Sequence, residues 1–202
     1  MERGPITFAM DLAEGLKQLR WAAFEVTLLA EGHLWLPPYK GSVLRGAFGA
    51  TFKRLVCVMP HRNCGACLLK QQCVYAVDFE SPARTAETPG AYMPHPFIIE
   101  PPLEDRTEYN PGDTLSFGLV LVGRAIDHLP YYIYTLDEMG KAGLGRGRGQ
   151  CRIDEVRHVG TDGARTRIYD GTEKQLATGW PVTSGESLSH GFAGATVGLE
   201  FL

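Results

Sequence analysis

Glycine alternates with other residues through the segment 141–152, KAGLGRGRGQCR, and arginine fills two of the gaps. Because glycine carries no side chain, such a loop can bring backbone N–H groups close to a polyanion. Guanidinium groups add charge and planar donors for phosphate or base edges. A flexible surface turn is the alternative interpretation. The residues predicted to bind phosphate here are Lys141, Gly143, Gly145, Arg146, Gly147, Arg148 and Gly149.

Cysteine forms a second group that could do chemistry. Four of the five cysteines follow the pattern Cys57-x6-Cys64-x2-Cys67-x5-Cys73. Four thiolates can complete a tetrahedral zinc site or hold an iron–sulfur cluster, with His61 as a substitute ligand. A closed site of this kind is structural, because it leaves no position open for a substrate, so we expect no catalytic metal. The alternative is a set of buried reduced thiols. This use of cysteine indicates a reducing compartment, and therefore the cytoplasm.

Basic residues are segregated from acidic ones along the chain. The net charge is −3, yet the segments 32–77 and 140–153 contain no Asp or Glu and hold ten of the 20 Lys and Arg residues. This distribution predicts a basic face on an acidic body, suited to a nucleic acid. The alternative is that folding scatters these charges over several faces. The basic residues predicted to extend a phosphate track along the first of these segments are Arg45, Lys53 and Arg54.

Hydrophobic periodicity indicates the elements that position these groups. Residues alternate between apolar and polar in 24–30, 115–122 and 151–158, which predicts strands, with a shorter strand at 97–100 and another at 166–169. Apolar residues recur every three to four positions in 41–59 and 129–140, which predicts helices. The order is β-α-β-β-α-β with a cysteine-rich insert. It predicts an α+β, ferredoxin-like (RRM-like) fold with an antiparallel sheet and two helices on one face.

The domain boundaries follow from composition. We predict a ferredoxin-like domain over residues 1–170, carrying a Cys-rich insert at 57–95. A polar Gly/Ser/Thr-rich stretch at 171–195 is predicted as a linker, and the alternating residues 196–202 as the first strand of a second ferredoxin-like domain. No apolar run approaches the roughly 20 residues that span a bilayer, so we expect no membrane partner.

Four segments in order resemble a known family. They are YKGSVLRGAFGATFKRLVC at 39–57, the cysteine segment, PPLEDRTEYNPGDTLSFGLVLVG at 101–123, and GLGRGRG followed by a strand. Together they resemble the CRISPR-associated RAMP-superfamily endoribonucleases that process precursor crRNA, over roughly residues 24–158, with the closing GLEFL similar to the entry into that family's second domain. The resemblance implies tandem ferredoxin-like domains that bind CRISPR repeat RNA.

The resemblance also implies a reaction. Enzymes of this class cut RNA without metal by attack of the 2′-OH on the adjacent phosphate, which leaves a 2′,3′-cyclic phosphate. The reaction needs a base, a cation for the phosphorane and an acid for the leaving oxygen. Because the family often places a His, a Tyr and a Lys near the first helix, the implied catalytic set is His33, Tyr39 and Lys40.

Each of these three residues has a simpler interpretation. His33 could be a solvated turn residue, Tyr39 a packing residue and Lys40 a phosphate contact. Two other functions therefore stay open. One is a non-catalytic RNA-binding RAMP subunit of a CRISPR effector complex in antiviral defence. The other is a metal-stapled protein-interaction module.

Overall fold

The computed structural model describes residues 15–59, 63–80 and 94–186. Strand β1, Arg20–Ala30, lies at the centre of its main sheet. It pairs antiparallel with β5, Thr114–Val122, on one side and with β6, Cys151–Val159, on the other. Strand β3, Phe97–Glu100, extends the sheet beyond β5. The resulting order, β3-β5-β1-β6, is that of a ferredoxin-like fold, which confirms the predicted fold class.

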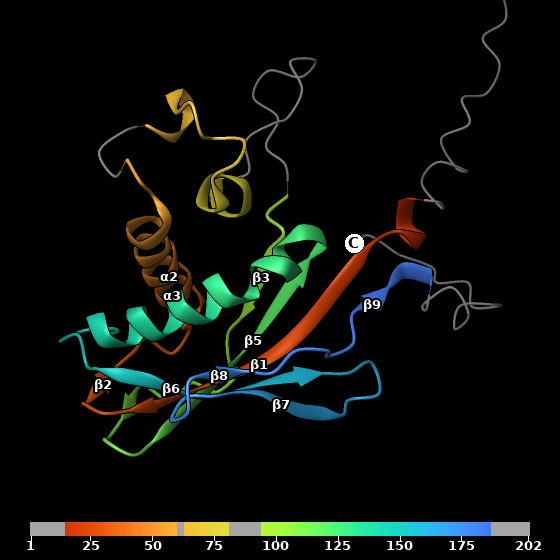
Figure 1. Ribbon diagram of the computed structural model, residues 1–202. Helices are drawn as coiled ribbons and strands as arrows, with labels where there is room; N and C mark the ends of the chain where they lie inside the picture. The colour runs from red at the N-terminus through yellow and green to blue at the C-terminus, as the bar shows by residue number, and fades with distance from the viewer. Residues whose placement is uncertain (1–14, 60–62, 81–93, 187–202) are drawn as a thin grey trace, which may run out of the picture.

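Two helices cover one face of this sheet (Figure 1). Helix α2, Gly41–Val56, follows β1, and helix α3, Leu129–Ala142, follows β5 after the 3-10 turn η3 at Gly123–His128. Both helices begin and end within three residues of the predicted positions. Residues 15–17, at the start of the described residues, form a short helical turn.

The core lies between the helices and the alternate residues of the strands. Phe24, Val26 and Leu28 of β1 are at most 2% exposed, and they share their face with Phe117 and Leu119 of β5 because of the antiparallel register. Period-two alternation places every second side chain of a strand on the same face. The apolar residues that alternate in the sequence of β1 and β5 are therefore the ones that face the core in the structure.

Further strands extend the sheet past β6. Strand β7, Arg165–Asp170, pairs with β6, β8, Gln175–Leu176, pairs with β7, and β9, Thr183–Ser184, returns to pair with the start of β1. Residues 171–186 are thus packed on the domain, whereas the sequence predicts a linker there. The sequence gives little indication of strands in this stretch, because β8 and β9 have two residues each and are too short to show a periodic pattern. The predicted strand at 196–202 lies outside the described residues.

A second, two-stranded sheet lies beside the main one. Strand β2, Leu34–Trp35, pairs with β4, Glu108–Tyr109. In the described part of the cysteine-rich insert there are a 3-10 turn, η1 at Cys64–Ala66, and a short π-helix, η2 at Ala76–Glu80. No helix among the described residues is long and apolar enough to cross a membrane.

Candidate nucleic-acid interface

The glycine–arginine loop, residues 143–149, is a closed hairpin that packs on β2. Leu144 and Gly149 exchange backbone hydrogen bonds of 2.9 and 3.2 Å, which close the loop. The N–H of Arg146 donates to the carbonyl of Trp35 over 2.9 Å, which ties the loop to the small sheet. The loop therefore has one defined shape, and the flexible-turn interpretation does not fit it.

Two of the glycines are required by this packing. A Cβ at Gly145 would lie 2.0 Å from the carbonyl oxygen of Trp35, and one at Gly149 would lie 2.1 Å from that of His33. Backbone oxygens cannot move aside as flexible side chains do. Gly147 is different, because nothing lies within 4 Å of its absent Cβ although its φ is +87°. Close approach to β2 accounts for the first two glycines, and loop conformation alone for the third.

Most backbone N–H groups of the loop already donate to carbonyls of the protein. The N–H groups of Leu144, Arg146 and Gly149 donate to backbone carbonyls, and Arg148 donates to Gly145 over 3.3 Å. Within the described residues, the N–H groups of Gly145 and Gly147 make no such bond. The loop can therefore offer a ligand two backbone donors, fewer than the sequence pattern suggests.

The two arginines of the loop are exposed to solvent. Neither Arg146 nor Arg148 forms an ion pair with another described residue. Arg148 has a φ of +51°, the left-handed region that glycine adopts more easily. An arginine at such a position is held in a strained conformation, which costs about 1 kcal/mol or more.

Trp35 also belongs to this surface, although no motif in the sequence marks it. Its side chain is 45% exposed, while its neighbours Leu34 and Leu36 are 0% and 4% exposed. The alternation of those three residues was the available signal, since two buried leucines force the residue between them outward. The ring lies 5.8 Å from that of His33, centroid to centroid, and the Trp35 carbonyl holds Arg146. Exposed aromatic rings are the groups on which unpaired bases stack, and exposed guanidinium groups bind phosphates.

The three residues of the implied catalytic set are not equally accessible. The side chain of His33 is 41% exposed, and its Nε2 lies 3.9 Å from a carboxylate oxygen of Glu108. Tyr39 is 66% exposed. Lys40, in contrast, is fully buried, and its ammonium donates to the backbone carbonyls of Pro38 at 3.1 Å and Glu104 at 2.9 Å. That position fixes the start of α2 and turns the ammonium away from any substrate.

The basic residues that flank the loop are mostly engaged by protein groups. Lys141 pairs with Asp137 at 2.8 Å and Glu138 at 2.7 Å, and these carboxylates raise the pKa of its ammonium. Arg152 lies 3.5 Å from a carboxylate oxygen of Glu31. Acids from outside the acid-free segments therefore neutralise part of the predicted basic face, because folding brings distant stretches together.

The basic residues of α2 face the cysteine-rich insert. The guanidinium of Arg45 lies over the rings of Phe79 and Phe97, at 5.2 and 5.0 Å from their centroids. The ammonium of Lys53 lies 5.4 Å from the centroid of Tyr75. Among the basic residues of this helix, Arg54 is exposed, whereas Arg45 and Lys53 are half-buried. The predicted phosphate track along α2 is thus reduced to Arg54, and Arg45 and Lys53 hold the insert.

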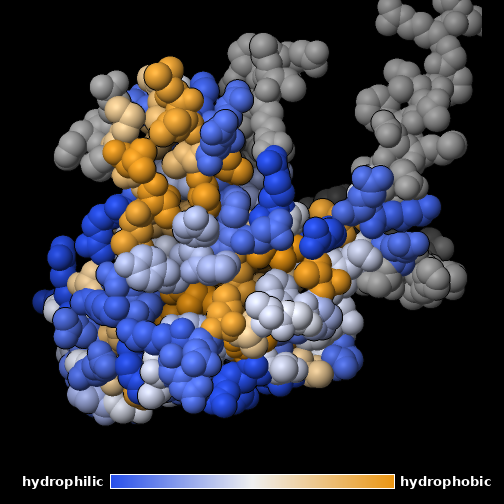
Figure 2. All heavy atoms as spheres, in the orientation of Figure 1, coloured by the Kyte–Doolittle hydropathy of each residue, from blue (hydrophilic) through white to orange (hydrophobic). Residues whose placement is uncertain are grey.

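The cysteines do not form a metal site in the described residues. No three Cys, His, Asp or Glu side chains come together there as metal ligands. All four cysteines of the insert are half-buried and unpaired by disulfides. Burial is the main cause of a raised pKa at Cys64, partly offset by the charge of Lys53. His61, the predicted substitute ligand, lies outside the described residues. The insert instead exposes apolar side chains, at Val58, Leu68 and Leu69 (Figure 2).

The chain matches one family model and one curated protein. A family model, AF_1859_N, described as an N-terminal domain, matches residues 19–180. A protein of Archaeoglobus fulgidus, described as uncharacterized, is 30% identical over 110 residues, which are 54% of this chain and 37% of that protein. The match therefore covers little more than a third of the length of this curated relative.

Two solved structures are similar at a lower level. The Csm3–Csm4 subcomplex of the type III-A CRISPR–Cas interference complex matches at 16% identity and a TM-score of 0.47, over 91% of this chain and 100% of that one. A Cas6 product complex matches at 20% identity and a TM-score of 0.37, over 73% of this chain and 44% of that one. Likeness at this level is limited, and the fold rests on the strand order described above.

Proposed function

The chain belongs to the AF_1859_N family of N-terminal domains, and from this premise we propose that it binds single-stranded RNA as a RAMP-type domain of a CRISPR system. Arg148 carries the proposal. It is an exposed arginine, without an ion pair to another described residue, held at a φ of +51° between two glycines. Glycine would relieve the strain, and a guanidinium kept in a strained and exposed position supports a function outside the fold. The resemblance of the four sequence segments to crRNA-processing proteins supports repeat RNA as the ligand.

The loop and β2 have complementary roles in this proposal. Arg146 and Arg148 neutralise backbone phosphates, and the free N–H of Gly147 adds a short-range donor. The exposed ring of Trp35 stacks an unpaired base beside them. Because stacking accepts every base, the surface favours unpaired RNA over duplex and reads little sequence. Sequence preference requires further contacts.

Salt-dependent RNA binding tests the proposal directly. The Arg146→Ala/Arg148→Ala variant should bind labelled single-stranded repeat RNA at least tenfold more weakly. The slope of log affinity against log salt should fall in magnitude by about 1.4, because each phosphate contact to a single strand contributes about 0.7. A matched control is Arg157→Ala/Arg165→Ala, which removes the same charge from arginines already paired with Glu155 at 2.7 Å and Glu25 at 3.5 Å. Equal losses in the two variants, or an unchanged slope, would contradict a specific loop site.

Metal-independent cleavage of the bound RNA is the second candidate function. It is favoured by one observation, the proximity of His33 to both Trp35 and the carboxylate of Glu108. A carboxylate beside a histidine orients the imidazole ring for proton transfer. In this candidate His33 takes the proton of the 2′-OH, an arginine of the loop stabilises the phosphorane, and Tyr39 protonates the leaving 5′ oxygen. Lys40 is not included, because its ammonium is buried.

Product analysis separates binding from cleavage. End-labelled repeat RNA is incubated with the protein in EDTA, and the products are examined for a 2′,3′-cyclic phosphate. A cyclic product that is lost in His33→Ala supports cleavage. Intact RNA in a sample that binds it leaves the non-catalytic RNA-binding subunit of an effector complex as the function. In that case the exposed apolar side chains of the insert offer a surface for a neighbouring subunit.

A further inference from the structure

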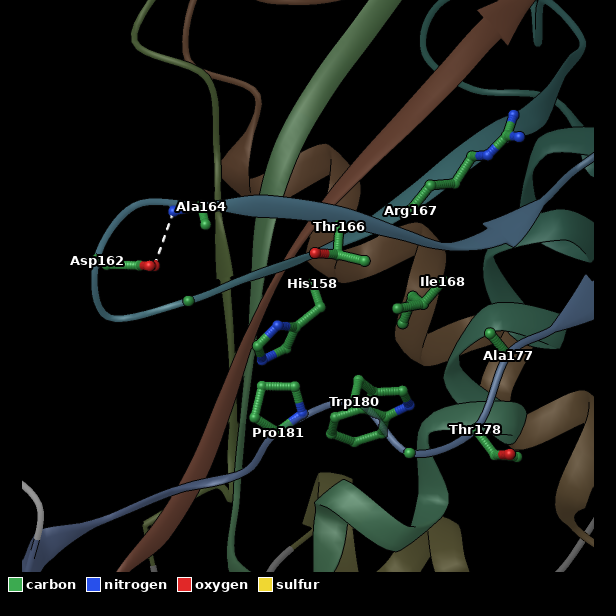
Figure 3. A pocket seen from close by; sticks show the side chains of 12 residues that line it. His158, Asp162, Ala164, Thr166, Arg167, Ile168, Ala177, Thr178, Trp180 and Pro181 are labelled. Carbon is green, nitrogen blue, oxygen red and sulfur yellow. Dashed lines mark hydrogen bonds between the residues drawn. The ribbon is translucent and has the colours of Figure 1, made fainter.

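A cavity of about 340 Å³ opens at the opposite end of β6 from the glycine–arginine loop (Figure 3). It lies between the β6–β7 hairpin and the segment 177–181, here called the strap, which leads from β8 towards β9. A backbone hydrogen bond of 2.7 Å from Ala177 to the carbonyl of Ile168 fixes one end of the strap. The volume is near the lower end of the ~300–1,000 Å³ of small-ligand sites.

Two aromatic rings form one wall of the cavity. His158 is 4% exposed, and its ring stacks on that of Trp180 with centroids 5.9 Å apart and planes 29° apart. Phe24 meets Trp180 edge-on at 5.1 Å, which holds the indole in place from the core. His158 also forms a hydrogen bond with the backbone of Pro181, so the ring joins the strap to the sheet. Burial lowers the pKa of His158, and the wall is therefore uncharged at neutral pH.

The polar groups of the cavity are few and differ in kind. The carboxylate of Asp162 is fixed at the hairpin tip, because one of its oxygens accepts a hydrogen bond of 2.9 Å from the N–H of Ala164. Thr166 adds a hydroxyl from β7. Arg167 is the one cation in the lining, but it pairs with Asp170 at 2.9 Å and its guanidinium points away from the cavity (Figure 3). The interior therefore accepts hydrogen bonds and offers no free positive charge.

We propose that this cavity binds a single nucleobase that carries an exocyclic amino group. The base stacks against Trp180, and its amino group donates to Asp162. Aromatic walls bind the faces of bases, and a carboxylate accepts from the amino groups of cytosine, adenine or guanine. Uracil has no amino group, so it binds more weakly. The phosphate stays outside, because a carboxylate at the tip repels it.

The proposal rests on the proposed RNA-binding function for the source of the base. His158 lies seven residues along β6 from Cys151, the first residue of that strand after the loop, so the two sites are about 23 Å apart at roughly 3.3 Å per residue. A single strand held by the loop can reach the cavity with a base a few nucleotides away. A free nucleotide is the other source of the same chemistry, and the experiment below distinguishes the two.

The first arm uses nucleoside 5′-monophosphates as probes. AMP, CMP, GMP and UMP are titrated separately into the protein while the indole N–H resonance of Trp180 is followed by NMR. We expect saturable shifts with one or more of AMP, CMP and GMP, and binding of UMP at least about tenfold weaker, which corresponds to ~1.4 kcal/mol. Asp162→Asn keeps the size of the side chain at an exposed position and should abolish the discrimination against UMP. No saturable shift with any of the four, or discrimination that survives Asp162→Asn, overturns the proposal.

The second arm separates the cavity from the loop. Oligouridylate and the same oligonucleotide with one internal cytidine, adenosine or guanosine are compared in the wild-type protein and in Arg146→Ala/Arg148→Ala. Tighter binding of an amino-bearing oligonucleotide supports an RNA base in the cavity. If the monophosphates bind but neither oligonucleotide does, the proposed RNA function fails and the cavity is a free-nucleotide site. If every oligonucleotide binds equally and no monophosphate binds, RNA binding stands and the cavity proposal fails.

Discussion

A single methyl group at Gly145 tests whether the loop depends on its packing against β2. In Gly145→Ala the new Cβ would start 2.0 Å from the carbonyl oxygen of Trp35, a backbone atom that cannot rotate away. The matched variant is Gly147→Ala, two residues further in the same loop. Its φ of +87° is as unsuited to alanine as the +68° of Gly145, but nothing lies within 4 Å of the new Cβ. The pair therefore differs in packing and not in conformational strain.

The two costs can be worked out separately. A left-handed conformation costs an L-residue about 1–2 kcal/mol, and the loss of unfolded-state entropy on replacing glycine returns about 0.4–1 kcal/mol. Gly147→Ala should therefore lower the free energy of unfolding by about 1 kcal/mol. Gly145→Ala must in addition separate the loop from β2 and lose the Arg146–Trp35 hydrogen bond, which adds about 0.5–1.5 kcal/mol for the bond alone. We expect a total of about 2 kcal/mol.

Urea unfolding followed by far-UV circular dichroism measures both values, and repeat-RNA affinity is measured on the same samples. At roughly 2–4 °C per kcal/mol for a chain of this size, Gly145→Ala should also melt at least 4 °C below the wild type. RNA affinity should fall more in Gly145→Ala than in Gly147→Ala, since only the former displaces Arg146. Equal stability losses in the two variants would refute the packing argument, because strain alone would then explain both.

Three other predictions concern the rest of the domain. Gly46→Ala should stabilise the protein by up to about 1 kcal/mol, because nothing lies within 4 Å of the new Cβ on α2, whereas Gly49→Ala should destabilise it, because its Cβ would lie 2.2 Å from the ring of Phe79. Chemical unfolding of both variants measures these changes, and a stabilising Gly49→Ala would contradict the docking of the insert on α2. The free energy of unfolding should fall as the pH drops below about 6.5, because the lowered pKa of His158 means that the unfolded chain binds a proton there before the folded chain does. In His158→Gln the difference between the free energies of unfolding at pH 7 and pH 5 should be smaller, and an unchanged difference would show that other groups cause it. In metal-free native protein a thiol reagent should modify the four half-buried cysteines of the insert before Cys151, which is 0% exposed and whose pKa burial raises to about 12. Added zinc should slow the modification of the four cysteines if they bind a metal together, and unchanged rates would argue against such a site.

The long elements of the fold are predictable because each carries many residues of one period. In β1 and β5 the alternation runs over most of the strand, and burial follows it. Strand β2 has two residues, so no period can be recognised, and the position of Trp35 beside the loop depends on pairing with β4 more than 70 residues later. The glycine–arginine loop is visible in the sequence, but the partner that gives it shape is not.

Charge was the least predictable property of the site. A lysine is rarely buried, yet Lys40 is, because the backbone carbonyls of the neighbouring Pro38 and of the distant Glu104 accept hydrogen bonds from its ammonium. Asp78 and His128, 50 positions apart, meet at 2.8 Å and join the insert to the start of α3. Such pairs depend on long-range folding, and composition along the chain cannot reveal them.

The central place of β1 has a consequence for synthesis on the ribosome. β1 ends at Ala30, and its partner β6 begins 121 residues later at Cys151. At a translation rate of about 5–20 residues per second, the edge of β1 that pairs with β6 stays unpaired for roughly 6–24 s after β1 is synthesised. During that time its apolar side chains and open backbone groups can pair with another nascent chain. Folding of the domain is therefore expected to be slow, and most vulnerable to aggregation before residues 151–159 leave the ribosome.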